Sequence, residues 1–213
     1  MPRRNTRNNA TDDRNRPGWF HVYNRARNGR KMFIDDQDRC EFVAILKRHL
    51  GKGEIRTRRE RKCTRIEGAN IVAGTLMATH FHLVIAQSEY GAMTKLLHAV
   101  LTAYVRYFNK RHGLQGPMFN GPYRARRLKN RSDLKWAIAY VHFNPQDLSY
   151  GFSTHNAYLA KEPPPWIRPA LEIFNGKAPY RTYIKAFAIA KDRLPTTDQL
   201  FSSSSASAGA SPS

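Results

Sequence analysis

Residues 70–86 read NIVAGTLMATHFHLVIA, and their pattern sets the topology expected for the chain. It contains two runs of apolar and β-branched residues, 70–78 and 80–86, and such runs are typical of strands. The small residues Ala78 and Thr79 lie at the junction of the two runs. We therefore expect the two strands to pair with each other as a hairpin.

A helix is expected on each side of this hairpin. Upstream, Asp35 and the acidic residue after it offer an N-cap for a helix that runs to about Leu50. Downstream, apolar residues recur at helical spacing over 93–108, and Gly113 is placed to end that helix.

Two further strands are expected outside these helices. Residues 19–23 are aromatic and β-branched, and residues 123–128 alternate in polarity. The resulting order, β-α-β-β-α-β, is the split βαβ pattern of ferredoxin-like folds. The predicted fold class is therefore α+β: a ferredoxin-like split βαβ sandwich with an antiparallel sheet and helices on one face.

A helical extension is expected to follow this unit. Ser132 is the predicted N-cap of a third helix, which Pro145 ends, and residues 182–193 are predicted to form one more helix. The expected organisation is a disordered basic arm at 1–17, a main domain at 18–150, an extension packing on it at 151–201 and a disordered Ser/Ala tail at 202–213.

The chain carries a strong positive charge. Among its 213 residues, 36 Lys and Arg stand against 16 Asp and Glu, which gives a formal net charge of +20. An excess of this size favours a negatively charged partner, nucleic acid first and an anionic membrane surface second. Hydrophobic residues make up 41% of the chain, which is enough for a folded core.

The sequence argues against membrane-spanning, secreted and disulfide-rich classes of protein. The longest apolar run, 71–78, is far shorter than the roughly 20 residues of a spanning helix. The N-terminus lacks the apolar segment of a signal peptide. Cys40 and Cys63 are too few for a disulfide scaffold and too far apart for a CxxC metal site. We therefore expect a soluble cytoplasmic protein, associated with the nucleoid, with no membrane partner.

Much of the charge precedes the third predicted helix. Residues 106–135 contain nine Lys and Arg and a single acid, Asp133, interleaved with aromatic residues, a pattern that suits a single nucleic-acid strand. The alternative is an ordinary solvated surface. The candidate DNA-binding residues are Arg106, Lys110, Arg111, Tyr123, Arg124, Arg126, Arg127, Lys129 and Arg131, with Arg3, Arg4 and Arg7 of the N-terminal arm.

Four residues have the chemistry of a metal-assisted nucleophilic site. His80 and His82 are two apart on a strand, so both imidazoles project from one face and suit a divalent metal. Tyr140 and Asn144 are one helical turn apart, and the Asn144 carbonyl offers an oxygen ligand. Two imidazoles with an oxygen fit Mg²⁺ or Mn²⁺ at least as well as zinc. A phenol beside a cation is a capable nucleophile, whereas the alternative is a core tyrosine beside polar histidines.

Several motifs occur together in a fixed order, and they resemble those of the single-tyrosine HUH transposases. The similarity is closest to the REP-associated tyrosine transposases and covers about residues 18–166. The motifs are WFHVYNR at 19–25, HFHLV at 80–84, YFNKRHG at 107–113, FNGPYR at 119–124, YVHFNP at 140–145 and FSTHNAYL at 152–159.

The resemblance implies a specific activity. Members of this family cut and rejoin single-stranded DNA through a 5′-phosphotyrosine intermediate, and they recognise short palindromic hairpins. The family nucleophile falls on Tyr140, the Mg²⁺- or Mn²⁺-binding histidines fall on His80 and His82, and Asn144 completes the metal site. A monomer without an obligate protein partner is expected. Ala78-Thr79 stands where relatives often have Pro-Asn, and Pro122 replaces an expected arginine.

Two other functions stay open at this point. The first is a non-catalytic protein that binds hairpin DNA or RNA on the same fold. The second is a metal-dependent nuclease that uses water as its nucleophile. The complete set of two histidines, a tyrosine and an asparagine favours the transesterase, because a pure binding module does not need that combination.

Overall fold

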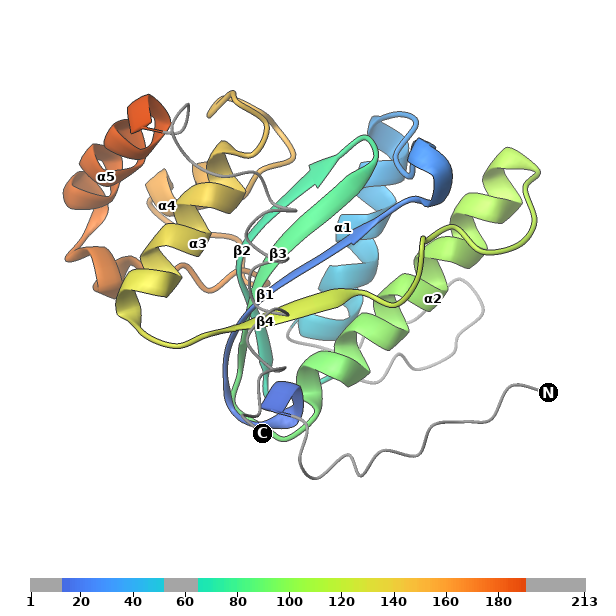
Figure 1. The fold of residues 1–213 in the computed structure, drawn as a ribbon, viewed down its shortest axis with the longest axis horizontal. Coiled ribbons are helices and arrows are strands. Elements are labelled where there is room, and N and C mark those ends of the chain that lie inside the picture. The colour runs from blue at the N-terminus through green and yellow to red at the C-terminus, as the bar shows by residue number, and fades with distance from the viewer. Residues whose placement is uncertain (1–12, 52–64, 191–213) are drawn as a thin grey trace, which may run out of the picture.

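A four-stranded antiparallel sheet lies at the centre of the fold (Figure 1). The computed structural model describes residues 13–51 and 65–190. Within them the strand order is β2-β3-β1-β4. The helices α1 (Asp36–Leu50) and α2 (Ala92–His112) follow β1 and β3, so the β-α-β-β-α-β order of the predicted ferredoxin-like α+β fold is confirmed. The strands are β1 (Gly18–Arg25), β2 (Ala69–Met77), β3 (His80–Gln87) and β4 (Arg124–Leu128).

The two central segments pair as the sequence predicts. Met77 of β2 lies opposite His80 of β3, so Ala78 and Thr79 alone connect the strands. Side chains of β3 then alternate between two apolar clusters. Phe81, Leu83 and Ile85 belong to the cluster on one face, and Val84 belongs to the cluster on the other.

The first face of the sheet is covered by α1 and α2. The Asp35 side chain caps α1 by accepting a hydrogen bond from the Asp38 N–H (3.1 Å). Gly113 ends α2 in the left-handed conformation (φ 63°), which glycine adopts without a steric penalty. Both ends agree with the prediction. The cluster between this layer and the sheet includes Phe20, Val22, Phe42, Phe81, Leu96, Leu97 and Tyr104.

The opposite face is covered by α3 (Arg131–Phe143) and the elements that follow it. These are α4 (His155–Leu159), a 3₁₀ turn at Leu171–Phe174 and α5 (Lys177–Ala190). Figure 1 shows α3, α4 and α5 on one side of the sheet, with α1 and α2 on the other. The predicted arrangement with helices on one face therefore holds for α1 and α2. The second face is covered by α3 and the C-terminal elements. Its cluster includes Val72, Val84, Leu134, Ile138, Tyr158, Phe174 and Ile184.

The outer edge of β2 is also covered by the C-terminal part of the chain. The Leu76 N–H donates to the Phe152 carbonyl (3.1 Å), and the Arg168 N–H donates to the Ile71 carbonyl (2.8 Å). Because these backbone groups are paired, β2 does not present a free edge along this stretch. The strand at the other end of the sheet is β4.

Two helix boundaries differ from the prediction. Asn130, and not Ser132, caps α3, because its side chain accepts from the Asp133 N–H (2.9 Å). The last helix begins at Lys177, before the predicted start at residue 182. Pro179 is compatible with this earlier start, because backbone N–H groups in a first turn have no partner within the helix.

Parts of the predicted arm and tail lie outside the described residues. This holds for 1–12 of the arm and for the whole tail at 202–213, and also for Cys63. Residues 13–17 of the arm are described and lie against the sheet. The Gln87 side chain donates to the backbone carbonyls of Arg14 (3.1 Å) and Arg16 (2.7 Å).

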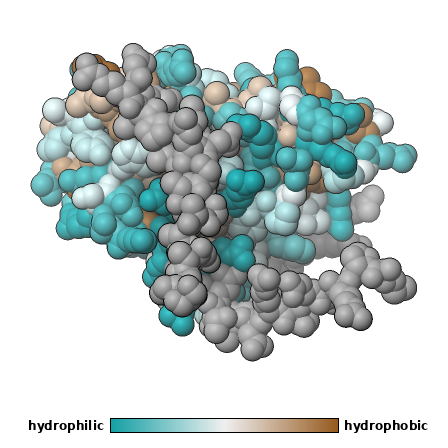
Figure 2. Space-filling view, in the orientation of Figure 1, coloured by the Kyte–Doolittle hydropathy of each residue, from teal (hydrophilic) through white to brown (hydrophobic). Residues whose placement is uncertain are grey.

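The surface is mainly hydrophilic. Figure 2 shows hydrophilic side chains over most of the described surface on this side of the molecule. Among the described residues, no helix combines the length and the apolar character that crossing a membrane requires.

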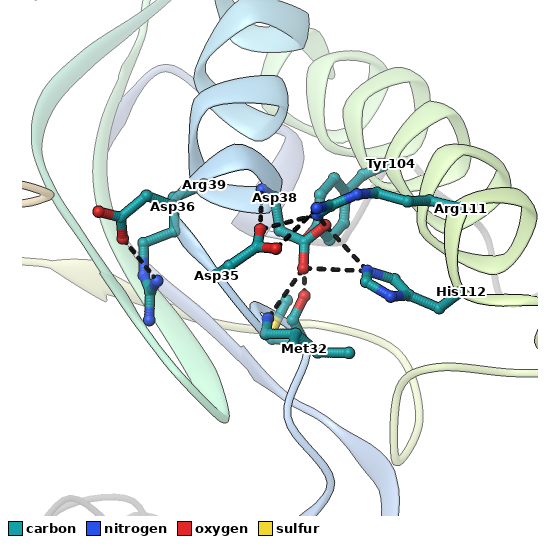
Figure 3. A network of polar contacts seen from close by, with 9 residues as sticks. Met32, Asp35, Asp36, Asp38, Arg39, Tyr104, Arg111 and His112 are labelled. Atoms are coloured by element: carbon teal, nitrogen blue, oxygen red, sulfur yellow. Dashed lines mark hydrogen bonds and ion pairs between the residues drawn. The ribbon is translucent and has the colours of Figure 1, made fainter.

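A buried carboxylate joins the start of α1 to the end of α2 (Figure 3). Asp38 accepts hydrogen bonds from the Ile34 N–H (2.8 Å), Arg111 Nη1 (2.5 Å) and His112 Nε2 (3.1 Å). Burial raises the pKa of Asp38, but these hydrogen bonds outweigh it, so the pKa lies below its usual value. Arg111 also pairs with Asp35 (2.6 Å), so two carboxylates hold this candidate DNA-binding guanidinium.

We expect Asp38→Asn to lower the free energy of unfolding at about pH 7 by about 2–3 kcal/mol, because a neutral amide replaces the buried carboxylate that accepts from Arg111 and His112. Urea denaturation measures the loss. Asp36→Asn is the matched control, because the Asp36 side chain is 79% exposed, and its effect should be small. The lowered pKa makes the Asp38 contribution full above about pH 4 and lost as the pH falls. A difference from wild type that persists unchanged at about pH 3 would contradict this assignment.

Candidate functional site

β3 directs both histidines of the HxH motif toward α3. The strand alternates, so His80 and His82 share a face while Phe81 between them is buried in the opposite cluster. The two ring centroids lie 5.1 Å apart. His82 is buried and pairs in register with Tyr23 of β1, whose ring stacks on it (5.5 Å between centroids).

α3 brings the tyrosine and the asparagine to the same place. The Tyr140 ring meets the His82 ring edge-on, with centroids 5.6 Å apart. Asn144 Oδ1 lies 3.2 Å from His80 Nε2. Asn144 is the C-cap and keeps helical angles (φ −55°, ψ −38°) although Pro145 follows, so it remains one turn from Tyr140. The structure thus places these four predicted residues in one cluster.

His80 is a neutral imidazole held at both ring nitrogens. Nδ1 contacts Thr79 Oγ1 at 3.0 Å, and Nε2 contacts Asn144. Burial lowers the pKa of His80 most, the hydrogen bond that its Nε2–H donates to Asn144 Oδ1 opposes this, and the positive charge of Arg25 lowers it further. A neutral imidazole is the form that binds metals.

A third histidine, His21, belongs to the cluster, although the sequence did not predict it as a site residue. His21 Nε2 lies 3.0 Å from His82 Nδ1, and the His21 ring also meets Tyr140 edge-on (5.8 Å). Burial, followed by the nearby charge of Arg126, lowers the pKa of His21 to about 3, so this imidazole is neutral. The signal was available, because His21 and Tyr23 alternate onto one face of β1. The pairing of β1 with β3, however, was needed to place that face against His82.

Trp136 is the second residue that sequence reasoning missed. It lies one turn before Tyr140 on α3, and the two rings are nearly parallel (13°) with centroids 5.0 Å apart. Tyr140 is only 5% exposed, with Trp136, His21 and His82 around its ring. These contacts fix the plane of the phenol.

The chemistry of the cluster fits a divalent cation with nitrogen and oxygen ligands. Two ligand atoms bound at right angles about 2.1 Å from one Mg²⁺ would be about 3 Å apart. The His80 Nε2 to Asn144 Oδ1 distance of 3.2 Å agrees with this. On β2, Thr75 lies opposite His82, and its buried hydroxyl has no hydrogen-bond partner among the described residues. Within those residues no group of three or more His, Cys, Asp or Glu could hold a metal, so any site here depends on the amide.

The candidate DNA-binding residues of β4 divide between the two faces of the sheet. Arg124 and Arg126 pair in register with Tyr23 and His21 and so share their face. Arg124 Nη1 donates to the Tyr23 hydroxyl (3.2 Å). Arg127 lies on the opposite face, where its guanidinium covers Phe20 at 5.6 Å from the ring centre.

The other described candidates lie outside β4. Arg106 and Lys110 are exposed on α2, in the layer on the far side of the sheet, and the Tyr123 hydroxyl contacts Thr94 of α2 (3.2 Å). Lys129 is exposed beyond β4. Arg131 donates to the Glu172 carbonyl (3.0 Å). Arg3, Arg4 and Arg7 fall outside the described residues.

A buried polar chain anchors α3 to β2, α4 and α5. Thr154 Oγ1 accepts from the Gly74 N–H (2.8 Å) and contacts His142 Nε2 (2.9 Å). The Tyr180 hydroxyl then contacts His142 Nδ1 (2.8 Å) and His155 Nδ1 (2.5 Å). Burial, and secondarily His155, lowers the pKa of His142 well below its usual value. His142 is therefore a structural residue.

We expect Tyr180→Phe to lower the free energy of unfolding by about 1–3 kcal/mol, because it leaves two buried imidazole nitrogens without their partner. Chemical denaturation followed by circular dichroism measures this. Tyr183→Phe is the matched control on the same helix, because the Tyr183 ring is only half-buried and no hydrogen bond of its hydroxyl to the described residues is seen. Equal effects of the two substitutions would show that the polar chain does not stabilise the fold.

Comparison with known proteins gives two similar solved structures. One is a REP-associated tyrosine transposase bound to a REP hairpin, with 15% sequence identity over 71% of this chain and 85% of that chain, and a TM-score of 0.49. The other is a candidate transposase from Deinococcus radiodurans R1, with 12% identity over 63% of this chain and 92% of that chain, and a TM-score of 0.39. No protein-family model and no curated protein matches the chain.

Proposed function

We propose that this protein is a metal-dependent single-stranded DNA transesterase of the HUH single-tyrosine type, which binds palindromic hairpin DNA and cleaves and rejoins it. One observation carries the proposal: Tyr140 contacts His82 while Asn144 contacts His80, across the interface between α3 and β3. A tyrosine that only filled the core would not need two imidazoles and an amide around it. The order of the sequence motifs supports the same function.

The proposed reaction is a reversible exchange of phosphodiester bonds. The Tyr140 oxygen attacks the scissile phosphorus, and the bond from phosphorus to the 3′ oxygen breaks. The proton of the phenol goes to the leaving oxygen, which gives a free 3′-OH. The phosphate stays on the 5′ oxygen of the downstream nucleotide and is now esterified to Tyr140. Attack by a 3′-OH on this phosphotyrosine ester releases the tyrosine and rejoins the strand.

His80, His82 and Asn144 are the residues that would hold Mg²⁺ or Mn²⁺. The cation, when bound, withdraws charge from the phosphate oxygens and so makes the phosphorus easier to attack. His21 contacts Nδ1 of His82, which leaves Nε2 as the ligand atom. This contact fixes the orientation of the His82 ring, as the outer partners of metal-binding histidines commonly do.

Arg124 and Arg126 are the cations best placed to bind the strand beside this site. They alternate on β4 onto the face that carries Tyr23, His21 and His82. Arginines with neighbouring aromatic rings bind single strands by neutralising phosphates and stacking on bases. Such phosphate contacts make affinity depend steeply on salt and do not by themselves select a sequence.

The decisive experiment is trapping of a covalent adduct. A single-stranded oligonucleotide that carries a REP-like hairpin is incubated with the full chain and Mn²⁺, and products are separated in SDS. We expect an SDS-stable protein–DNA adduct that disappears in Tyr140→Phe, because the phenol oxygen is the attacking atom. Tyr183→Phe is the matched control and should keep the adduct, because Tyr183 lies on α5, where its ring meets that of Phe174 and not those of His80 and His82.

Each alternative function gives a different result. An adduct that persists in Tyr140→Phe would show that another residue is the nucleophile. If the DNA is cleaved but no adduct forms, and the cleavage persists in Tyr140→Phe and is lost in His82→Ala, the protein is a nuclease that uses water. Tight, salt-sensitive hairpin binding without cleavage under any metal would identify a binding protein.

Metal binding by the amide is tested separately. We expect Asn144→Ala to weaken Mn²⁺ binding by about tenfold or more, because it removes an oxygen ligand beside His80. Calorimetric titration of the DNA-free protein measures this affinity. Asn156→Ala, at an exposed position of α4, is the matched control and should bind Mn²⁺ as the wild type does. Equal affinities of all three proteins would remove Asn144 from the metal site.

A further inference from the structure

A small cavity lies beside Trp136, the residue whose ring stacks on Tyr140. Its volume is about 180 Å³, and two elements line it. β4 contributes Arg126 and Leu128, and α3 contributes Asp133 and Trp136. The cavity is smaller than the roughly 300–1,000 Å³ of pockets that bind drug-sized molecules, so it suits one ring system.

One wall of the cavity is a fixed aromatic ring. Trp136 is held from two directions, because its ring stacks on Tyr140 and the Phe187 ring meets it edge-on (6.1 Å, 71°). The other apolar lining residue, Leu128, is buried. A flat indole with an aliphatic neighbour offers a planar ligand a surface for stacking.

The polar lining residues have opposite charges and leave hydrogen-bonding capacity unused. Oδ2 of Asp133 accepts from the Lys129 N–H (3.0 Å), which leaves Oδ1 able to accept from a ligand. Arg126 is half-buried, and its side chain forms no hydrogen bond or ion pair with the residues that the structure describes, Asp133 included. The cavity therefore presents a carboxylate acceptor and guanidinium donors to the same small volume.

We infer that this cavity binds a single nucleobase of the DNA strand and that it prefers guanine. Trp136 and Leu128 pack against the plane of the base. The carboxylate of Asp133 accepts from the N1–H and N2–H groups of guanine, and Arg126 donates to its O6 or N7 acceptors. Thymine has a single N–H donor and no amino group, so it leaves part of the carboxylate unpaired.

The inference rests on the proposed function in one respect, the identity of the ligand as single-stranded DNA. Trp136 joins the cavity to Tyr140, so the bound base belongs to a nucleotide next to the phosphate that Tyr140 attacks. The cavity then selects the position of cleavage along the strand. Arg126 and Asp133 become specificity-determining residues, and Trp136 both stacks on the base and fixes the plane of the phenol.

The fluorescence of Trp136 gives a direct test. Trp19→Phe and Trp166→Phe leave it as the single tryptophan among the three of the chain, and Tyr140→Phe prevents covalent reaction. Pentanucleotides of thymidine alone are compared with ones that carry deoxyguanosine, deoxyadenosine or deoxycytidine at the centre. We expect saturable quenching of Trp136 emission, with the guanine pentanucleotide bound about tenfold more tightly than the thymidine one.

The polar part of the site is tested by Asp133→Asn. Asparagine can still accept from the Lys129 N–H, so the first turn of α3 is preserved. We expect the preference for guanine to be lost while thymidine binding stays within about twofold, because the full carboxylate is needed to accept from both N–H groups of guanine, whereas one oxygen suffices for the single N–H of thymine. Glu162→Gln is the matched control: it removes one negative charge at an exposed position far along the chain and should keep the preference.

The outcomes separate this inference from the proposed function. If no pentanucleotide alters the Trp136 emission of the single-tryptophan variant, while the wild-type chain forms the adduct, the base site alone is overturned. Equal quenching and equal affinity for all four pentanucleotides would overturn the preference for guanine. Guanine-selective quenching in the variant, together with no adduct from the wild-type chain under any metal, would support the base site and overturn the transesterase.

Discussion

The antiparallel pairing of β1 with β3 sets both the packing of the core and the geometry of the site. Each strand places apolar residues, such as Phe20 and Phe81, against α1 and α2, and polar aromatic residues against α3. The register sets Tyr23 beside His82 and brings His21 Nε2 to His82 Nδ1. A slip of one residue would exchange the faces, so the packing of the core and the geometry of the site are specified together.

The second constraint is the attachment of α3 to the sheet. Its apolar residues, such as Leu134 and Ile138, are buried with those of the C-terminal elements. The side chains of Thr154 and Tyr180 contact the two ring nitrogens of His142 and so fix the helix in place. Tyr140 and Asn144 project from the same helix toward β3. Their positions relative to the histidines therefore depend on residues of α4 and α5 that do not enter the cluster.

Much of this arrangement could be predicted from local sequence patterns. The hairpin at 70–86, the cap at Asp35 and the end of α2 at Gly113 follow from strand runs and capping chemistry, which are local properties. The spacing of Tyr140 and Asn144 follows from helix geometry in the same way. Asn130 and Ser132 are both good caps, so the sequence could not decide between them.

What the sequence could not supply are contacts between elements distant along the chain. His21 and Trp136 join the site only because β1 pairs with β3 and α3 turns a particular side toward the sheet. Charge alone did not distinguish Arg111, which two carboxylates hold, from Arg126, which lines the cavity beside Trp136. Burial and register separate such residues, and neither is visible in a count of basic side chains.

The two edges of the sheet differ in how they are protected against pairing with another molecule. The extension covers the backbone of β2, whereas β4 closes the other end of the sheet with the sequence RARRL. Two such strands from different molecules would have to bring six guanidinium groups together before any backbone hydrogen bond could form. Like charges on an edge strand oppose this kind of β-augmentation. The arginines proposed to bind DNA thus also oppose edge-to-edge pairing of β4 between molecules.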